Sequence, residues 1–406
     1  MNSTRRQFLQ HAALGGAAAT LLPPALRATD AVPAKSGSAT PTYVPPKGEI
    51  VDWHTHWLGP SVVKLLSERT SGPRYFVNAQ GERFALAKGE AAPAPGAKPV
   101  ATYTYDIGER LRHLDQVGVR RQLLGLVSPA YDGTLPPEEA RPLWRAQNDD
   151  LAALVQKYPD RFFALATLPT ANPQWAAEEL ARAHRDLGLI GATLPLDAFI
   201  SLESARSLAP IFEVAQKYGS HLYIHRGPAA TPGQVPEVGT TNAYFGLPAT
   251  RSPNGEVPGL PGDHAWARST LITSTHLAAG AITLALTDLL DPYPDVTVQL
   301  TMIGGSIAQV IEAIEQRTDR AGQANPRERL RRIYLDTGAT GRGPRGIALA
   351  AKVFGGDRIL FGSDYGPWPS IEPFVAGVAA AEISADEKKL IYRENGHAIL
   401  KARGRA

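Results

Sequence analysis

The sequence contains no cysteine in its 406 residues. This absence excludes disulfide bonds and thiolate metal sites, so any bound metal ion must be held by histidine and carboxylate side chains. It does not locate the protein, because a chain without cysteine is compatible with an oxidising or a reducing compartment. At this length the chain can form one large domain with a sizeable core, or two smaller domains.

The sequence also has little excess charge. Its formal net charge is +3, and residues 1–28 contain Arg5, Arg6 and Arg27 but no acidic residue. The rest of the chain is therefore close to neutral, and it has no basic stripe interleaved with aromatic residues. These features argue against a nucleic-acid partner.

No apolar run is long enough to predict a stable membrane span. The N-terminus has twin arginines within Thr4–Leu9 (TRRQFL), an Ala/Leu/Gly segment, and the small residue Ala28 at a candidate cleavage position. This pattern predicts a twin-arginine-type signal peptide over residues 1–28 and a periplasmic location; an ordinary amphipathic helix is the alternative interpretation. Residues 29–48 are rich in Pro, Ser and Ala and predict a linker, so the folded domain is expected over residues 49–406.

After the linker, apolar runs typical of buried strands alternate with amphipathic helical runs. Strands are expected over residues 49–54, 121–127, 162–168, 189–194, 221–225, 296–302, 333–337 and 359–364. Helices are expected between them, over residues 109–118, 140–159, 173–188, 205–219, 306–317 and 345–356 among others. Eight such units predict a (β/α)8 TIM barrel. A doubly wound open sheet is the alternative, but no glycine-rich dinucleotide loop follows the first strand.

Two insertions interrupt this pattern. One runs from Gly59 to Thr104 after the first strand, and the other runs from Gly227 to about Ala265 after the fifth. Both follow the carboxyl ends of strands, where barrel enzymes build their active sites. Both insertions are therefore candidate substrate lids.

Polar side chains end three of the expected strands. His54 and His56 are two residues apart, so an extended chain places both on one face. His225 ends the fifth strand and Asp364 ends the eighth. Taken singly, a His-X-His pair, a strand-terminal histidine and a turn aspartate are all common without a metal. Together they form a nitrogen and oxygen ligand set at one barrel mouth, and they predict a site for one divalent ion.

The chain resembles the amidohydrolase-related family, which includes aminocarboxymuconate-semialdehyde and aromatic acid decarboxylases. The resemblance covers residues 49–400 and rests on ordered blocks such as DWHTHWLGP, YPDRFFALATLP, YLDTGA and GDRILFGSDYGPWP. It implies a (β/α)8 barrel with one divalent metal ion, zinc rather than manganese being favoured. It also implies that His54, His56, His225 and Asp364 are the ligands, that the substrate is a small molecule, and that a homodimer is an option.

The sixth strand departs from the family pattern. Relatives have a histidine there, followed by two glycines, and this histidine handles a proton during catalysis. The present block reads VTVQLTMIGGSIAQ, which keeps Gly304 and Gly305 but places Met302 at the histidine position. A thioether cannot transfer protons at neutral pH. His264 and His276 are candidate substitutes, although a loop histidine and a helix-face histidine are the simpler interpretations.

Candidate substrate residues are Arg226, Arg83 and Lys88. Arg226 follows the candidate ligand His225 and could pair with a substrate carboxylate, or it could point outward because strand neighbours face opposite sides. Arg83 and Lys88 lie roughly where relatives carry a substrate-binding arginine. Asp336 ends the seventh strand and is expected either to hydrogen-bond a metal ligand or to play a structural role.

Two enzyme mechanisms fit these residues. In hydrolysis, the metal ion activates a water molecule that attacks a carbonyl, and Asp364 passes the proton on. In non-oxidative decarboxylation, the ion binds the substrate carboxylate and a neighbouring oxygen, and an acid protonates the carbon that loses carbon dioxide. The sequence therefore predicts a hydrolase or carboxy-lyase acting on a small organic or aromatic acid or a related ring compound. The alternative, supported by Met302, is an exported metal-binding barrel without turnover.

Overall fold

The computed structural model describes residues 49–86, 91–93, 97, 99–100, 106–125, 135–227, 265–321 and 324–404. The predicted signal peptide, the predicted linker, Lys88, His264 and most of the second insertion lie outside these residues. Among the described helices, none is both long and apolar enough to cross a lipid bilayer.

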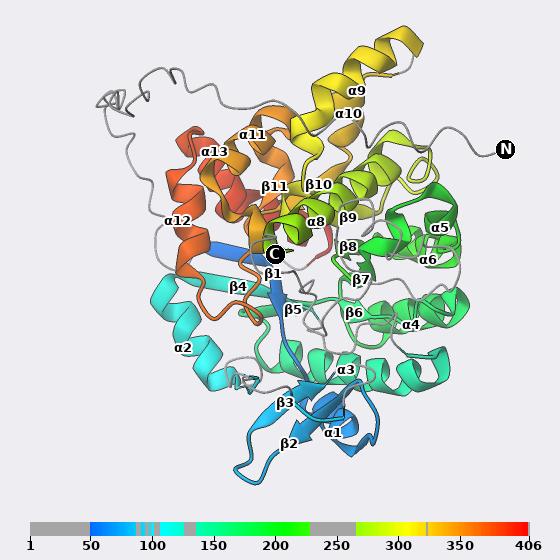
Figure 1. The fold of residues 1–406 in the computed structure, drawn as a ribbon, viewed down its shortest axis with the longest axis vertical. Coiled ribbons are helices and arrows are strands. Elements are labelled where there is room, and N and C mark those ends of the chain that lie inside the picture. Colours follow the sequence, from blue (N-terminus) through cyan, green and yellow to red (C-terminus); the bar gives the residue numbers. More distant parts are fainter. Residues whose placement is uncertain are drawn as a thin grey trace, which may run out of the picture. The chain divides into compact units, whose positions relative to one another are not determined.

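Parallel strands form the centre of the described fold (Figure 1). They are β1 (Ile50–His56), β4 (Val119–Gly125), β5 (Phe162–Ala164), β6 (Ala166–Thr167), β7 (Gly191–Pro195), β8 (His221–His225), β9 (Thr297–Leu300), β10 (Ile333–Asp336) and β11 (Ile359–Leu360). One sheet has the order β1-β4-β5 and another has the order β11-β10-β9-β8-β7-β6. Only Leu165 separates β5 from β6, so these two segments are the single strand expected over residues 162–168.

Backbone hydrogen bonds link the two sheets. At one junction Leu165 N donates to Leu124 O over 3.1 Å, and Ile190 N donates to Ala164 O over 3.1 Å. At the other junction Trp53 N donates to Phe361 O over 2.8 Å, and Asp364 N donates to His54 O over 2.7 Å. The strands therefore follow one another in the ring order of the expected (β/α)8 barrel.

Helices flank the strands in Figure 1. They are α2 (Ile107–Val117), α3 (Pro137–Lys157), α4 (Pro173–Arg185), α5 (Leu202–Arg206), α6 (Ala209–Tyr218), α8 (Ala265–Ala281), α9 (Ile307–Ala321), α10 (Pro326–Leu330), α11 (Pro344–Phe354), α12 (Glu372–Ala380), α13 (Ala385–Lys389) and α14 (Asn395–Ala402). The expected continuous helix over residues 205–219 is wrong, because α5 ends before α6 begins. Pro210 has no N–H to continue an α-helix, and it lies in the first turn of α6, where that group is not needed.

Two strands end earlier than the sequence suggests. The sixth barrel strand, β9, stops at Leu300, and Met302–Gly304 form the 3-10 turn η5. The eighth, β11, stops at Leu360, so Asp364 lies in the following turn rather than in the strand. Both turns contain backbone that a strand cannot accommodate, since φ is +54° at Met302 and +56° at Asp364.

The described part of the first insertion adds a helix and a hairpin outside the ring of strands. It contains α1 (Pro60–Glu68) and an antiparallel hairpin of β2 (Arg74–Val77) and β3 (Arg83–Leu86), both at the lower edge of Figure 1. Helix α1 packs against β2 and α3. Its apolar residues form a separate buried cluster with α3, which comprises Leu58, Val62, Val63, Leu66, Tyr75, Leu135, Ala140, Leu143 and Trp144. The sequence predicted an insertion here but not this hairpin.

Candidate metal centre

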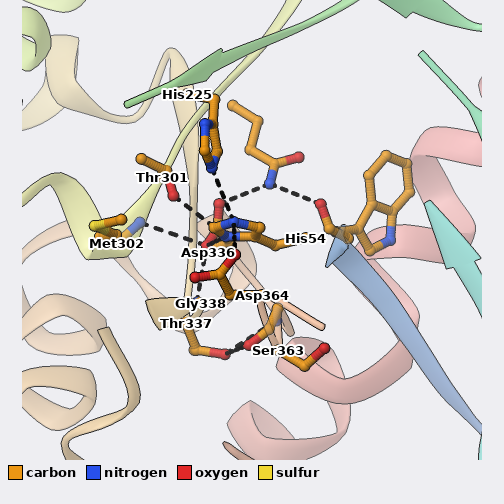
Figure 2. A network of polar contacts seen from close by, with 12 residues as sticks. His54, His225, Thr301, Met302, Asp336, Thr337, Gly338, Ser363 and Asp364 are labelled. Carbon is orange, nitrogen blue, oxygen red and sulfur yellow. Dashed lines mark hydrogen bonds and ion pairs between the residues drawn. The ribbon is translucent and has the colours of Figure 1, made fainter. Parts of the chain in front are cut away.

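Four buried side chains converge at the carboxyl ends of the strands. One ligand atom from each of His54, His56, His225 and Asp364 lies within 4.8 Å of the other three. Nε2 of His54 is 3.2 Å from Nε2 of His225 and 3.2 Å from Oδ1 of Asp364, and Nε2 of His56 is 3.0 Å from that same oxygen. Figure 2 shows His225, Asp336 and Asp364 arranged around the His54 ring. The structure thus brings together all four side chains that the sequence singled out as candidate ligands.

Hydrogen bonds fix the orientation of the His54 ring. Its Nδ1 is 2.8 Å from Oδ1 of Asp336 and 3.2 Å from Oγ1 of Thr301. Asp336 is itself held, because it accepts from Nε2 of Gln299 and from N of Gly338, each over 2.8 Å. A proton on Nδ1 directed at a carboxylate leaves the Nε2 lone pair facing the cluster, which is the tautomer that a metal ion requires.

His225 is oriented in the same sense. Its Nδ1 lies 2.9 Å from the carbonyl oxygen of Arg226 and can only donate to that oxygen. The Nε2 atom of His225 is therefore also left as an acceptor directed at the cluster. Two imidazoles with their outer nitrogens committed to oxygen acceptors, beside a third imidazole and a carboxylate, fit a divalent ion.

Glycines allow the backbone to pack directly on these rings. A Cβ atom at Gly338 would lie 2.0 Å from Nδ1 of His54, and one at Gly362 would lie 2.7 Å from Cβ of His54. At Gly366, where φ is +132°, a Cβ atom would lie 2.9 Å from Cβ of His56. The close approach of two chain segments, after β10 and after β11, to two histidines explains why these positions have no side chain.

Asp364 is carried by a turn that is tied to β1. The preceding residue, Ser363, donates to the buried Asp52 carboxylate through its N (3.0 Å) and its Oγ (2.5 Å). Asp52 also accepts from Nε2 of Gln122 over 3.0 Å. Burial raises the pKa of Asp52 to about 6, although these hydrogen bonds act in the opposite direction. Asp52 therefore links the strand of His54 to the turn of Asp364.

The cluster has an electrostatic demand for positive charge. Burial disfavours protonation of His54, but Asp336 and Asp364 outweigh it and raise the pKa of His54 to about 10. The pKa of His225 is held well below its usual value by burial and by the neighbouring His56 and His54. The carboxylates thus favour a positive charge beside His54, and a divalent ion can supply that charge in place of the Nε2 proton of this ring. His225 is already neutral, as an imidazole that binds a metal ion must be.

The other candidate residues lie in different places. Met302 follows β9 beside the network, where its N donates to Oδ1 of Asp336 over 3.4 Å and its Sδ accepts from Oγ1 of Thr340 over 3.6 Å. His276 lies on α8 with its Nδ1 4.0 Å from Oδ1 of Asp197. Arg226 is half-buried directly after β8, whereas Arg83 lies in the β2–β3 hairpin.

Sequence reasoning did not identify the residues that support the four-residue cluster. Gln299 contacts Asp336, Thr301 contacts His54, and Asp52 contacts both His54 N within β1 and Ser363 across the ring of strands. The signal available was a polar residue within an apolar strand, such as Gln299 in VTVQL and Asp52 in IVDWH. That signal indicates a buried hydrogen-bond network but does not identify its partners.

The chain matches one family model and several known proteins. The family model described as Amidohydrolase matches residues 51–401. The chain is similar to a gamma-resorcylate decarboxylase of Rhizobium sp. (strain MTP-10005), with 26% identity over 73% of this chain and 87% of the relative. It is also similar to a 2-amino-3-carboxymuconate-6-semialdehyde decarboxylase of Dictyostelium discoideum, with 25% identity over 65% of this chain and 67% of the relative.

A solved structure has the same fold. It is a dihydroxybenzoic acid decarboxylase of Polaromonas sp. JS666 with bound manganese and the inhibitor 2-nitroresorcinol. The TM-score is 0.62 with 21% sequence identity, and the match covers 88% of this chain and 97% of the other. This likeness confirms the barrel fold expected from the sequence.

Proposed function

This chain belongs to the amidohydrolase family, and we propose that it is a metal-dependent carboxy-lyase that removes carbon dioxide from a small aromatic acid. Family membership confirms the expected metal-dependent enzyme class and disfavours the alternative of a barrel without turnover. The buried cluster of His54, His56, His225 and Asp364 is the observation that carries the proposal. The decarboxylase names of the relatives support the choice of reaction.

One divalent ion is proposed at this cluster. Three imidazoles and a carboxylate suit zinc, and manganese is the alternative supported by the ion in the structural neighbour. When bound, such an ion stabilises negative charge on substrate oxygens as a Lewis acid. Elemental mass spectrometry of protein purified without chelator should find about one equivalent of zinc or manganese. A His54→Ala/His56→Ala variant should contain none.

Decarboxylation also needs a proton. The carbon–carbon bond breaks, carbon dioxide leaves, and the electron pair that remains on the ring carbon takes a proton to form a new C–H bond. Met302 cannot supply it. We propose that His276 does, supported by Asp197. Asp197 lies two residues beyond Pro195, which pairs in register with His225, and α8 packs against the turns that follow β7 and β9.

A His276→Gln variant tests this proton source. Loss of a general acid typically costs 10²–10⁴-fold in rate, so kcat should fall by at least about 100-fold while metal content stays the same. Imidazole added to a His276→Ala variant should restore part of the rate. His184→Gln is a matched control, because His184 lies on α4 and contacts Ser220 instead. Unchanged kcat in His276→Gln would exclude this residue as the donor.

Hydrolysis is the second candidate, because the same cluster could activate water for attack on a carbonyl. A panel of hydroxybenzoates with matched lactones, esters and amides separates the two reactions. We expect release of carbon dioxide in heavy water together with one deuterium in the product. Product from the lactones, esters or amides without carbon dioxide from the acids would overturn the carboxy-lyase proposal. Asp364→Asn should abolish either reaction.

Arg226, Arg83 and Lys88 remain candidates for binding the substrate carboxylate. Of these, Arg226 is the one we propose, because it directly follows the candidate ligand His225 in the chain. Arg226→Gln should raise KM for the acid, whereas Arg83→Gln should leave KM unchanged.

We further propose export to the periplasm as a folded protein, with residues 1–28 removed. Residues 49–406 would then form the mature barrel after the linker. The support is the Arg5-Arg6 pair followed by the Ala/Leu/Gly segment. An Arg5→Lys/Arg6→Lys variant should accumulate in the cytoplasm in cell fractionation. An unchanged periplasmic yield would exclude the twin-arginine route.

A further inference from the structure

A buried arginine on helix α2 contacts the two chain segments that carry the candidate ligands His56 and Asp364. Arg110 is completely buried and donates to the carbonyl oxygen of His56 and, over 2.9 Å, to Oε1 of Gln122. Its guanidinium also lies 4.8 Å from the ring centroid of Tyr365. Since Tyr365 directly follows Asp364, one side chain contacts both the end of β1 and the turn after β11.

One helical turn later, His113 contacts the same tyrosine. Its Nδ1 is 3.0 Å from the hydroxyl oxygen of Tyr365, and its Nε2 is 3.3 Å from Oε1 of Glu372 at the start of α12. Glu372 is further held by Ser370, whose Oγ donates to Oε2 over 2.6 Å. Residues three apart lie on one helix face, so Arg110 and His113 hold Tyr365 at its ring and at its hydroxyl.

This arrangement controls the distance between His56 and Asp364 in the metal centre. His56 and Asp364 come from segments more than 300 residues apart, yet Nε2 of His56 is 3.0 Å from Oδ1 of Asp364. The backbones meet where His56 N donates to Tyr365 O over 2.8 Å. Arg110 holds this junction through the carbonyl of His56 on one side and the ring of Tyr365 on the other.

Burial of a guanidinium contributes little net stability to a fold. Removing such a charge from water is unfavourable unless hydrogen bonds replace its hydration. The bonds of Arg110 reach the ligand-bearing segments directly, and they also reach them through Gln122, which donates to Asp52. Residues that orient metal ligands from outside commonly change metal affinity by 10–100-fold when they are replaced.

We propose that Arg110 and His113 are positioning residues that set the separation of His56 and Asp364 and thereby the metal affinity. This inference rests on the metal centre proposed above, but not on the reaction. Metal affinity then depends in part on two residues of α2, a helix outside the ring of strands, although neither residue is a metal ligand.

Metal dissociation constants measured by competition with a chromophoric chelator test the proposal. Arg110→Met and His113→Leu should each weaken binding of Mn²⁺ or Zn²⁺ by 10–100-fold. His113→Gln should restore most of the affinity, because its amide can still hydrogen-bond the Tyr365 hydroxyl. Arg141→Met is the matched control, since Arg141 likewise lies over an aromatic ring (Trp175, 4.6 Å) and pairs with Glu178, and its affinity should stay within twofold of the parent.

The visible absorption of the cobalt-loaded protein supplies a readout that general destabilisation would not change. We expect altered absorption bands in Arg110→Met and parent-like bands in Arg141→Met. A folded Arg110→Met variant with the parent's affinity and spectrum would overturn the proposal. Should that variant not fold, the comparison of His113→Leu with His113→Gln decides in the same way.

The outcome is separable from the proposed reaction. If the parent binds metal but releases no carbon dioxide, the carboxy-lyase proposal is refuted. The metal affinities of the Arg110 and His113 variants still test the positioning role. A parent that binds no divalent ion, even after reconstitution, overturns both.

Discussion

Gly338 is the residue at which the packing of the metal centre is tightest. It follows the end of β10, and its N donates to Asp336 while its Cα lies against the His54 ring. A methyl group there would lie 2.0 Å from Nδ1 of His54. The backbone fixes the position of this carbon, so rotation of the alanine side chain cannot relieve the clash. We therefore expect Gly338→Ala to displace His54 and to weaken metal binding by at least about tenfold.

Gly343→Ala is the control for this substitution. Gly343 has an ordinary φ of −68°, and a Cβ atom there would meet nothing within 4 Å. Its metal affinity, measured by the same chelator competition, should equal that of the parent. Equal affinities for both variants would show that contact with the His54 ring does not matter for binding.

His221 lies at the opposite end of β8 from His225 and should contribute a pH dependence to folding. It is completely buried, its Nε2 lies 2.9 Å from Oε1 of Gln299, and burial, with a smaller effect of Arg403, lowers its pKa to about 3. The unfolded chain, with a histidine pKa near 6.5, binds a proton below that pH while the folded chain does not. Stability should therefore fall as the pH drops from about 6.5 to about 3, by at most about 1.4 kcal/mol per pH unit from this residue.

Urea unfolding of the parent and of His221→Gln at pH 7 and at pH 4 measures this effect. Chelator in every sample removes the separate pH dependence of metal binding. Glutamine does not titrate, so the loss of unfolding free energy between the two pH values should be smaller in the variant. The same loss in both proteins would contradict the assignment of this pH dependence to His221.

At the scale of elements, the segment after β9 depends on glycine. Met302, Ile303, Gly304 and Gly305 have successive φ values of +54°, +49°, +68° and +62°. At Gly305 a Cβ atom would also lie 2.3 Å from the carbonyl oxygen of Ser274 on α8. Gly305→Ala would therefore combine the backbone strain of a positive φ, on the order of 1–3 kcal/mol, with a clash against α8.

Gly81→Ala isolates the strain from the clash. Gly81 has a φ of +80° in the turn between β2 and β3, and a Cβ atom there would meet nothing within 4 Å. Thermal unfolding should show a small loss of stability for Gly81→Ala and a clearly larger one for Gly305→Ala. Equal losses would mean that the packing of α8 on this turn contributes nothing.

The elements themselves were predictable where local patterns determine them. Alternating apolar strands and amphipathic helices gave the eight units, and His54, His56 and His225 lie in strands β1 and β8, where the pattern placed them. The ends of β9 and β11 were not predictable, because the left-handed conformations of Met302 and Asp364 depend on contacts with β10 and β1. The β2–β3 hairpin was missed because its strands are only four residues long and lie outside the ring, where β2 packs on α1.

At the scale of the whole molecule, the support of the site could not be read from the sequence. Arg110 and Asp336 lie 226 residues apart in the chain, and Arg110 reaches Tyr365 and Asp336 reaches His54 only because the barrel closes. Strand-end histidines are visible in a linear pattern, whereas a buried arginine on an outer helix resembles any other helical charge. Closure of the ring thus determines which polar residues become partners of the metal centre.

The same closure makes a bound ion a cross-link between distant parts of the fold. The candidate ligands come from β1, β8 and the turn after β11, which are the first, fifth and eighth units of the ring. An ion that binds only the folded chain adds about 2.7 kcal/mol to the free energy of unfolding at a free concentration 100 times its Kd. Chelator should therefore lower the melting temperature of the parent, and one equivalent of Zn²⁺ or Mn²⁺ should restore it. His54→Ala/His56→Ala should melt at one temperature with or without the ion. If neither chelator nor metal changes the melting temperature of the parent, these strands are held together without an ion.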